Sequence, residues 1–358
     1  MSNLLNLYPL QFQLILRNYP FGNRWIVSEY QKGPFPEDHR VAETWETCDR
    51  PGESSTVTNG PLAGSSLHEL IARFGADLLG ADVVARCGTR FPLLIKLLDV
   101  SHSLGEQAHH SDELARARGL SDPGKTEAWY MLRTRPGATI RCGAKPGITP
   151  ETALQAILDG SSRELMREYP VHPGDAFLLH AGTMHFSEGG MIFYEIMQNS
   201  DVYIGLGAPD ANLPEAEREK IARLALEGAS LDGKFDPHIQ PVLLQEGLNR
   251  RSFVFACPYF ALERLDLAVP YALECDGQRF YVLTQIEGAC TVSAGGTVET
   301  LHMGQSCLLP AACGTVTLAP QPGCSLLKAY VPDIALNIAA PLRAAGFSDQ
   351  AVKQLQGL

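Results

Sequence analysis

The strongest constraint on the fold comes from four polar residues in three separated segments. Gln107 and His109 lie in LGEQAHHSDELA, Glu127 lies in GKTEAWY, and His185 lies in GDAFLLHAGTMHFSEGG. Because residues two apart in a strand point to the same face of a sheet, Gln107 and His109 can face one interior. The other two residues would reach that interior from neighbouring strands. This spacing is typical of a β-barrel.

The same four side chains form a mixed nitrogen and oxygen ligand set. Such a set suits a hard-to-borderline divalent cation, and zinc is the ion we expect. Each residue alone is weak evidence, because a single histidine is more often a core or surface residue than a ligand. Together they predict one zinc ion per chain.

Short β runs and turns, with helical interruptions, organise the rest of the chain. The segment SSLHELIARFGADLLG has apolar residues at helical spacing, with Ser66 as the expected N-cap and Gly80 as the expected end. TPETALQAILDG, SSRELMREY and residues 209–230 are also predicted to be helical. From about residue 250, short β runs at turn-spaced intervals predict a second small β-barrel or sandwich.

The two β modules are expected to be related. VHPGDAFLLHAGTMH and LHMGQSCLLPAACGT share a glycine, a polar position, an apolar run and a small-residue turn. In the second segment, Gly314 or its neighbour takes the place of His185, so we expect no metal there. Chance similarity stays an alternative, because short β patterns recur often.

Charge and cysteine content limit the class of protein. The formal net charge of -11 argues against nucleic acid or an anionic membrane as a partner, because phosphate backbones require a clustered basic face. The first 25 residues have no basic region or cleavage site around their apolar stretch, so we expect no signal peptide. The nine cysteines form no C-x-x-C pair, which favours a reduced, cytoplasmic protein. We expect a monomer or a weak homodimer.

These segments, with AETWE and STVTNGPLAGSSLHEL nearer the start, resemble the type I, zinc-dependent phosphomannose isomerases in their short bacterial form. The similarity runs from about residue 40 to 201, and more loosely from about 250 to 332. It implies two cupin-type jelly-roll barrels and the interconversion of mannose 6-phosphate and fructose 6-phosphate, or of a related sugar phosphate. It also implies that the metal ligands are Gln107, His109, Glu127 and His185.

The expected domains follow from this resemblance and from the patterns above. They are an N-terminal catalytic cupin domain with helical insertions at 1–208, a helical connection at 209–249, a C-terminal cupin-like β domain without metal at 250–334, and a helical tail at 335–358. At 358 residues the chain is long enough for two cores.

Two lysines are candidates for the chemistry. Lys125 lies two residues before Glu127 and would share its face, and the resemblance implies a functional lysine at this position. A lysine beside a metal can take part in proton transfer, although a solvated lysine in a turn is the alternative. Lys96 interrupts the apolar run PLLIKLLD, which predicts a partner or a role, and we assign it to substrate binding. A side chain that reaches solvent from the strand end is the alternative.

The resemblance implies further pocket residues. Glu43 would line the same pocket as a catalytic residue, and Trp45 would form part of its wall. Asp201 falls where the family chain turns toward the mouth of the site, although it could simply cap that turn.

Three positions depart from the family pattern. A glycine near position 205 replaces an arginine, Gly105 replaces a serine, and His110 replaces a proline. Either the substrate differs, or Arg90, Arg141 or Lys145 supplies the lost contacts. We therefore include Arg90 and Arg141 among the predicted substrate-binding residues.

Two other functions stay open. The chain could be a metal-bearing cupin that binds a sugar or sugar acid without turnover, as a sensing or regulatory protein, and the missing arginine favours this alternative. A cupin oxygenase would be expected to use several histidines and iron, whereas a set of glutamine, glutamate and two histidines is closer to a redox-silent zinc site.

Overall fold

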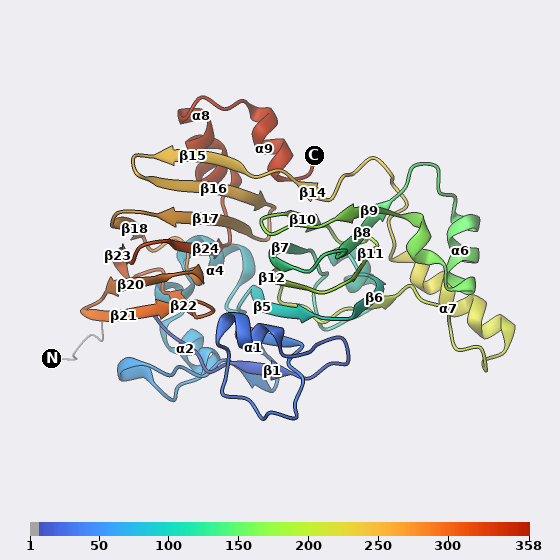
Figure 1. Ribbon diagram of the computed structural model, residues 1–358, viewed down its shortest axis with the longest axis horizontal. Coiled ribbons are helices and arrows are strands. Elements are labelled where there is room, and N and C mark those ends of the chain that lie inside the picture. The colour runs from blue at the N-terminus through green and yellow to red at the C-terminus, as the bar shows by residue number, and fades with distance from the viewer. Residues whose placement is uncertain (1–6) are drawn as a thin grey trace.

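In the computed structural model, which describes residues 7–358, the strands form two units of two sheets each (Figure 1). The first unit lies on the right of the view and the second on the left, with the C-terminal helices above the second. The predicted class, mainly β with helical insertions, is confirmed. Within residues 7–358 the sheets stay open and do not close into the predicted barrels.

The first unit holds a seven-stranded and a five-stranded sheet. Their strand orders are β1-β2-β5-β12-β7-β10-β14 and β13-β6-β11-β8-β9, and β3 and β4 form a separate pair. The bounds are β1 Ile15–Arg17, β2 Glu43–Thr47, β3 Asp49–Arg50, β4 Glu53–Ser54, β5 Leu93–Val100, β6 Ser103–Ala108, β7 Glu127–Thr134, β8 Thr139–Ala144, β9 Met166–Pro170, β10 Ala176–Leu179, β11 His185–Glu188, β12 Met191–Gln198, β13 Ile204–Gly205 and β14 His238–Ile239.

The second unit holds a six-stranded and a four-stranded sheet. Their strand orders are β15-β16-β17-β24-β19-β22 and β18-β23-β20-β21. The bounds are β15 Val242–Glu246, β16 Asn249–Ala256, β17 Ala261–Leu267, β18 Tyr271–Cys275, β19 Tyr281–Glu287, β20 Ala289–Ala294, β21 Thr297–His302, β22 Ser306–Leu309, β23 Gly314–Pro320 and β24 Cys324–Tyr330. These strands begin at Val242, inside the range 209–249 that was expected to be a helical connection.

The two units share one topology. Taken in chain order, β1, β2 and β5–β12 correspond one by one to β15–β24, and each strand has the same neighbours as its counterpart, apart from the edge strands β13 and β14 that the first unit adds. The relation predicted from the two similar segments is therefore supported by the strand order. His185, the first residue of β11, corresponds to Gly314, the first residue of β23.

The predicted helix that starts after Ser66 forms with a defined cap. The Ser66 hydroxyl accepts a hydrogen bond from the Glu69 backbone N–H, and the Glu69 carboxylate accepts one from the Ser66 N–H. This capping box fixes the first turn of α2 (Leu67–Phe74). Gly75 interrupts the predicted helix, and its continuation, α3 (Ala76–Leu79), is followed by Gly80 as predicted.

The other helical predictions are confirmed in part. TPETALQAILDG forms α6 (Pro150–Asp159), but SSRELMREY forms only the 3-10 turn η2 (Ser162–Leu165) before it enters β9. The charged segment at 209–230 forms α7, which contacts α6. The remaining bounds are α1 Trp25–Tyr30, η1 Gly60–Leu62, α4 Ala81–Cys87, α5 Asp112–Ala117, α7 Glu215–Glu227, the π-helical turn η3 Ile334–Ala339, α8 Ala340–Ala344 and α9 Asp349–Leu355.

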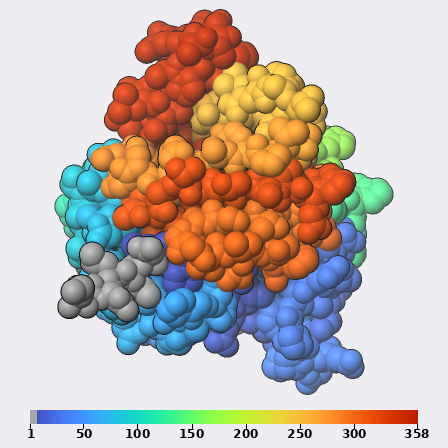
Figure 2. Space-filling view, turned by 90° about the vertical axis from the view of Figure 1, so that its left-hand side faces the viewer, coloured from blue at the N-terminus to red at the C-terminus, as the bar shows by residue number. Residues whose placement is uncertain are grey.

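The large sheets of the two units pack against each other. Ile95 and Ile196 of the first unit belong to one buried apolar cluster with Leu262 and Ala329 of the second. Side chains alternate along a strand, so Lys96, next to Ile95, points the other way, into the interior of the first unit. Figure 2 shows the end of the molecule that lies on the left in Figure 1, where the second unit (orange) lies between the C-terminal segment (red) and the N-terminal part of the chain (blue).

Within residues 7–358, none of the helices combines the length and apolar character that a membrane crossing requires.

Candidate metal centre

Three of the four predicted metal ligands meet between the two sheets of the first unit. Nε2 of His109 lies 3.3 Å from Oε2 of Glu127, and Nε2 of His185 lies 3.2 Å from Oε1 of Glu127. One ligand atom from each residue lies within 4.8 Å of the others, and all three residues are buried. The arrangement matches what a single cation would need.

The strand register explains how these residues meet. Glu127 is the first residue of β7 in the larger sheet, whereas His185 is the first residue of β11 in the smaller one. Gln107 pairs directly with His185, so both side chains lie on the same face of the smaller sheet. His109 follows β6 by one residue. Gln107 is buried and faces the same interior, as the spacing predicted.

Hydrogen bonds fix which nitrogen of each histidine is free. Nδ1 of His109 lies 3.0 Å from the Val202 carbonyl, and Nδ1 of His185 lies 2.9 Å from the Thr183 carbonyl. Because a carbonyl only accepts, each Nδ1 donates to its carbonyl, which leaves each Nε2 to face Glu127. Among residues 7–358, neither Nε2 atom has a hydrogen-bond partner, and both are buried. Two buried ring nitrogens therefore face one carboxylate, and a cation bound between them would satisfy all three groups.

Electrostatics keep His109 and Glu127 in the protonation states of metal ligands. Burial, together with the nearby Lys125, lowers the pKa of His109 to about 3, so the ring is neutral at pH 7. Burial alone would raise the pKa of Glu127, but Lys125 and His109 hold it well below its usual value. Nζ of Lys125 lies 2.8 Å from Oε2 of Glu127, so the predicted catalytic lysine is beside the candidate centre.

A row of buried charges crosses the larger sheet next to this centre. Nζ of Lys96 lies 3.3 Å from Glu43 and 3.1 Å from Glu195. Trp45 donates its indole N–H to Glu43 at 2.7 Å, and Trp129 donates to Glu195 at 3.0 Å. The structure thus brings the predicted pocket residues Lys96, Glu43 and Trp45 together.

Glu195 was missed by the sequence reasoning, although a signal for it was present. It is an acid within the apolar run MIFYEIMQ, as Lys96 is a base within PLLIKLLD. Burial raises the pKa of Glu195 above its usual value, and Lys96 partly offsets this effect. Burial alone would lower the pKa of Lys96, but Glu195 and Glu43 hold it above its usual value.

Replacing Lys96 by methionine is expected to destabilise the protein strongly. The change leaves two buried carboxylates without their cation, and breaking a buried ion pair by removing one partner costs about 3 to 5 kcal/mol. Denaturant unfolding measures the change in the free energy of unfolding. Lys220→Met, on the exposed side of α7, is the matched control and should change it little. A Lys96→Met variant as stable as this control would contradict the described ion pairs.

Two predicted substrate-binding arginines lie away from this row. Arg141 pairs with Glu164 and Glu168, and its cross-strand partner is Phe186, which points to the opposite face from His185. The structure therefore does not bring Arg141 to the site. Lys145 donates to the Glu164 carbonyl and is likewise occupied elsewhere.

Arg90 contacts residues next to the segment that supports His109. It pairs with Asp122 at 2.9 Å and donates to the backbone carbonyl of Asn199. Asp122 also accepts from the Asp201 backbone N–H at 2.8 Å, and the Asp201 side chain is 73% exposed. The contact that orders the turn at Asp201 thus runs through its backbone rather than through its carboxylate.

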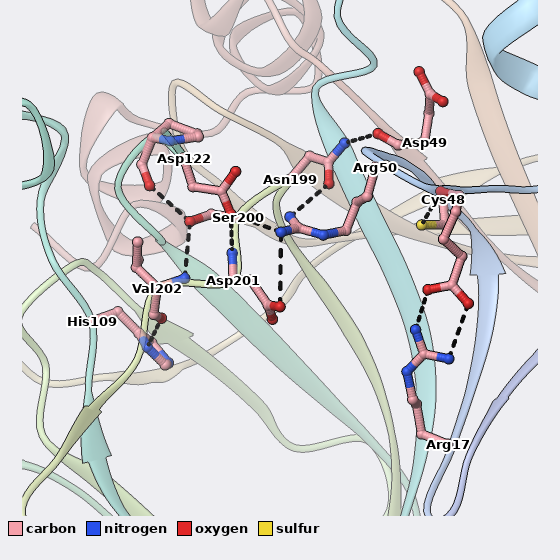
Figure 3. A network of polar contacts seen from close by, with 12 residues as sticks. Arg17, Cys48, Asp49, Arg50, His109, Asp122, Asn199, Ser200, Asp201 and Val202 are labelled. Carbon is pink, nitrogen blue, oxygen red and sulfur yellow. Dashed lines mark hydrogen bonds and ion pairs between the residues drawn. The ribbon is translucent and has the colours of Figure 1, made fainter. Parts of the chain in front are cut away.

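Figure 3 shows an arginine that the sequence reasoning also missed. Arg50 lies between Asp122, at 2.7 Å, and Asp201, at 3.8 Å, close to the Val202 segment that holds His109. Arg17 is a second one: it pairs with Glu53, and its guanidinium carbon lies 3.9 Å from the ring centroid of Trp45. Each of these two arginines stands alone in a short strand, so the sequence pattern does not indicate that it lies near the candidate centre.

The glycine that departs from the family pattern lies next to a predicted ligand. Gly205 on β13 pairs with Gln107, so a side chain at position 205 would share the face of Gln107 and His185. An added Cβ there would lie 3.4 Å from the ring of Tyr203. The corresponding strand starts of the second unit carry Tyr281 in place of Glu127 and Gly314 in place of His185.

Comparison with known proteins identifies the family. Residues 10–128 match the family model "Phosphomannose isomerase type I, catalytic domain", and residues 249–327 match "Mannose-6-phosphate isomerase, cupin domain". The chain is 30% identical over 280 residues to the mannose-6-phosphate isomerase ManA of Bacillus subtilis, which covers 78% of this chain and 86% of the relative. The chain belongs to the type I phosphomannose isomerase family. Membership in this family makes it an isomerase.

Other relatives agree with this assignment. The mannose-6-phosphate isomerase of Streptococcus mutans is 34% identical over 161 residues, which are 45% of this chain and 49% of the relative. The crystal structure of the Bacillus subtilis mannose 6-phosphate isomerase aligns with a TM-score of 0.77 at 23% identity, over 90% of this chain and 99% of that one. A mutant of Salmonella typhimurium phosphomannose isomerase aligns with a TM-score of 0.75 at 18% identity, over 91% and 100%. These structural matches show that the fold is shared.

Proposed function

We propose that this isomerase is zinc-dependent and interconverts mannose 6-phosphate and fructose 6-phosphate, or a closely related sugar phosphate. The observation that carries the proposal is the buried group of His109, Glu127 and His185, in which two ring nitrogens without a hydrogen-bond partner among residues 7–358 face one carboxylate. The relatives named mannose-6-phosphate isomerase support the choice of substrate.

The residues fit a zinc ion by their chemistry. His109, Glu127 and His185 would hold it, with Gln107 as the fourth ligand, and zinc accepts such nitrogen and oxygen donors. A zinc ion held there would polarise the substrate oxygens and stabilise the negative charge that develops as a proton moves between C1 and C2. The two donor histidines are already oriented by the carbonyls of Val202 and Thr183.

The remaining chemistry would fall to side chains around the centre. Lys125, beside Glu127, is placed to move a proton or to stabilise developing charge. Glu43 would act on the same substrate carbons, held in place by Lys96 and by the indole N–H of Trp45. Trp45 would supply a wall for the sugar ring.

The same proposal covers the fold of each unit and the cellular compartment of the protein. Each unit would be a cupin-type jelly roll, as their common strand order and the cupin-domain match at 249–327 suggest. The first unit would be catalytic, and the second would hold no metal. A reduced cytoplasmic setting agrees with the nine free cysteines, since Cys87 is exposed and the other eight are buried. We expect a monomer or a weak homodimer.

A substrate panel tests the proposed reaction. Purified protein is incubated with mannose 6-phosphate, fructose 6-phosphate and the two unphosphorylated sugars, and product formation is followed by NMR. We expect conversion of the phosphorylated sugars in both directions. Conversion of the unphosphorylated sugars alone would contradict the assigned substrate.

One observation favours the second candidate, a metal-bearing protein that binds a sugar without turnover. The position beside Gln107 that carries arginine in the resembled family is Gly205, which offers no cation. Under this alternative the panel would show saturable binding of a sugar and no conversion of any of the four compounds.

A further inference from the structure

A cavity with a volume of about 510 Å³ lies between the two units. Its walls come from the segment around α4 and α5 of the first unit, from Gln198 and Asn199 at the end of β12, and from Pro258 and Tyr259 of the second unit. Met197 pairs with Glu127 on the interior face of the larger sheet, so Gln198 points to the other face. The sheet therefore separates this cavity from the candidate metal centre.

Positive charge gathers at this cavity, although the chain as a whole is acidic. Arg86, Arg90 and Arg116 line it. Arg86 donates to the backbone carbonyls of Pro332 and Pro258, which are neutral, so its charge is not compensated. Within residues 7–358, Arg116 has no hydrogen bond or ion pair from its side chain, and Arg90 shares the carboxylate of Asp122 with Arg50.

The acidic groups of the cavity are already engaged. Asp112 accepts hydrogen bonds from the Tyr259 hydroxyl at 2.7 Å, from the Gly124 backbone N–H at 2.8 Å and from the Gln198 amide at 3.1 Å. Asp122 is held by two arginines. The donors of Arg116 thus remain available to an incoming anion.

The rest of the wall is apolar and partly aromatic. It consists of Phe91, Pro92, Leu120, Pro258 and the ring of Tyr259. Cavities of roughly 300 to 1,000 Å³ with apolar walls and a few polar groups are typical of small-molecule sites. An arginine fork suits the oxygens of a phosphate group in particular.

We propose that this cavity binds a small phosphorylated molecule, with its phosphate at Arg116 and Arg90 and its flat or apolar part against Tyr259 and Leu120. The site is separate from the metal centre, and the proposal does not depend on the reaction carried out there.

Cys87 provides a direct reporter for occupancy. It lines the cavity, and it is the exposed one among the nine cysteines. Burial raises the pKa of its thiol, so labelling with a small thiol reagent is best followed at mildly alkaline pH. The probes are adenosine monophosphate, which has a phosphate and a flat ring, and inorganic phosphate. We expect adenosine monophosphate to slow the labelling of Cys87, and Cys87→Ser to remove the signal.

The variants connect this protection to the arginines. Arg116→Ala is expected to weaken the binding of adenosine monophosphate by roughly ten-fold or more, as loss of a charge-assisted contact does. Arg223→Ala is the matched control, because Arg223 pairs with Glu219 on the exposed side of α7. Calorimetry of the zinc-loaded protein gives the dissociation constants. Protection by both probes, or by adenosine monophosphate alone, supports the proposal.

Three results would overturn it. The first is an unchanged labelling rate with both probes at millimolar concentration. The second is equal affinity in the wild type, in Arg116→Ala and in Arg90→Ala. The third is protection that disappears when mannose 6-phosphate is added in excess, since that would place the probe at the metal centre.

Discussion

Replacing His185 by alanine is expected to remove most of the zinc from the purified protein and to abolish measurable isomerisation. The variant keeps Glu127 but loses one of the two nitrogen donors that face it. Loss of a group that only supports a metal ligand weakens binding by about 10- to 100-fold, and loss of a ligand should cost more than that. Elemental analysis of the purified variant measures the metal content.

His172→Ala is the matched control for this change. His172 precedes β10, its side chain is 78% exposed, and its ring contacts only Asp175 among charged groups within residues 7–358. The control should keep its zinc and its activity. If His185→Ala keeps full zinc occupancy, the metal site has been assigned to the wrong residues.

Replacing Lys125 by alanine is expected to lower kcat by roughly 100-fold or more, because the loss of a proton-transfer or charge-stabilising group typically has that effect. The zinc content should stay near that of the wild type, since Lys125 contacts Glu127 but offers no ligand atom while it is protonated. Steady-state kinetics with mannose 6-phosphate, together with elemental analysis, separate the two properties.

Lys145→Ala is the control here, because the Lys145 amine donates to the Glu164 carbonyl away from the centre. It should leave kcat unchanged. A Lys125→Ala variant with wild-type turnover would show that Lys125 has no part in the reaction. A variant that loses its zinc would show instead that Lys125 supports Glu127.

Side-chain periodicity predicted part of the site correctly. The spacing of Gln107 and His109 indicated one inward face, and the register with His185 places Gln107 on that face. Periodicity alone could not place Glu127 opposite His185, because the two residues start strands in different sheets. The mixed ligand set and the resemblance to a family joined them before the structure did.

The position of Arg141 away from the candidate centre has a simple physical cause. Its neighbour Cys142 pairs with His185, and a shift by one residue in a strand turns a side chain to the other face. The sequence does not fix such a register, so nearness in the chain was a poor guide. Arg17 and Arg50 were not predicted because their partners, Glu53 and Asp122, lie far from them in the chain.

The second unit suggests that part of the charged row is structural. Lys96 on β5 pairs with Glu195 on β12, and in the corresponding strands Glu263 on β17 pairs with Lys328 on β24. The ion pair is thus present in both units with its polarity reversed, although the second unit has Gly314 in place of His185. Stabilising the sheet is therefore one role of the Lys96 pair, beside any contact with substrate.

The most direct test of the account is isomerase activity on mannose 6-phosphate after metal removal and zinc addition. The protein is treated with a chelator, freed of it, and titrated with zinc while fructose 6-phosphate formation is followed. We expect chelation to abolish activity and about one zinc ion per chain to restore it. Full activity in protein shown to contain no metal, or no activity at any zinc concentration in folded protein, would contradict this expectation.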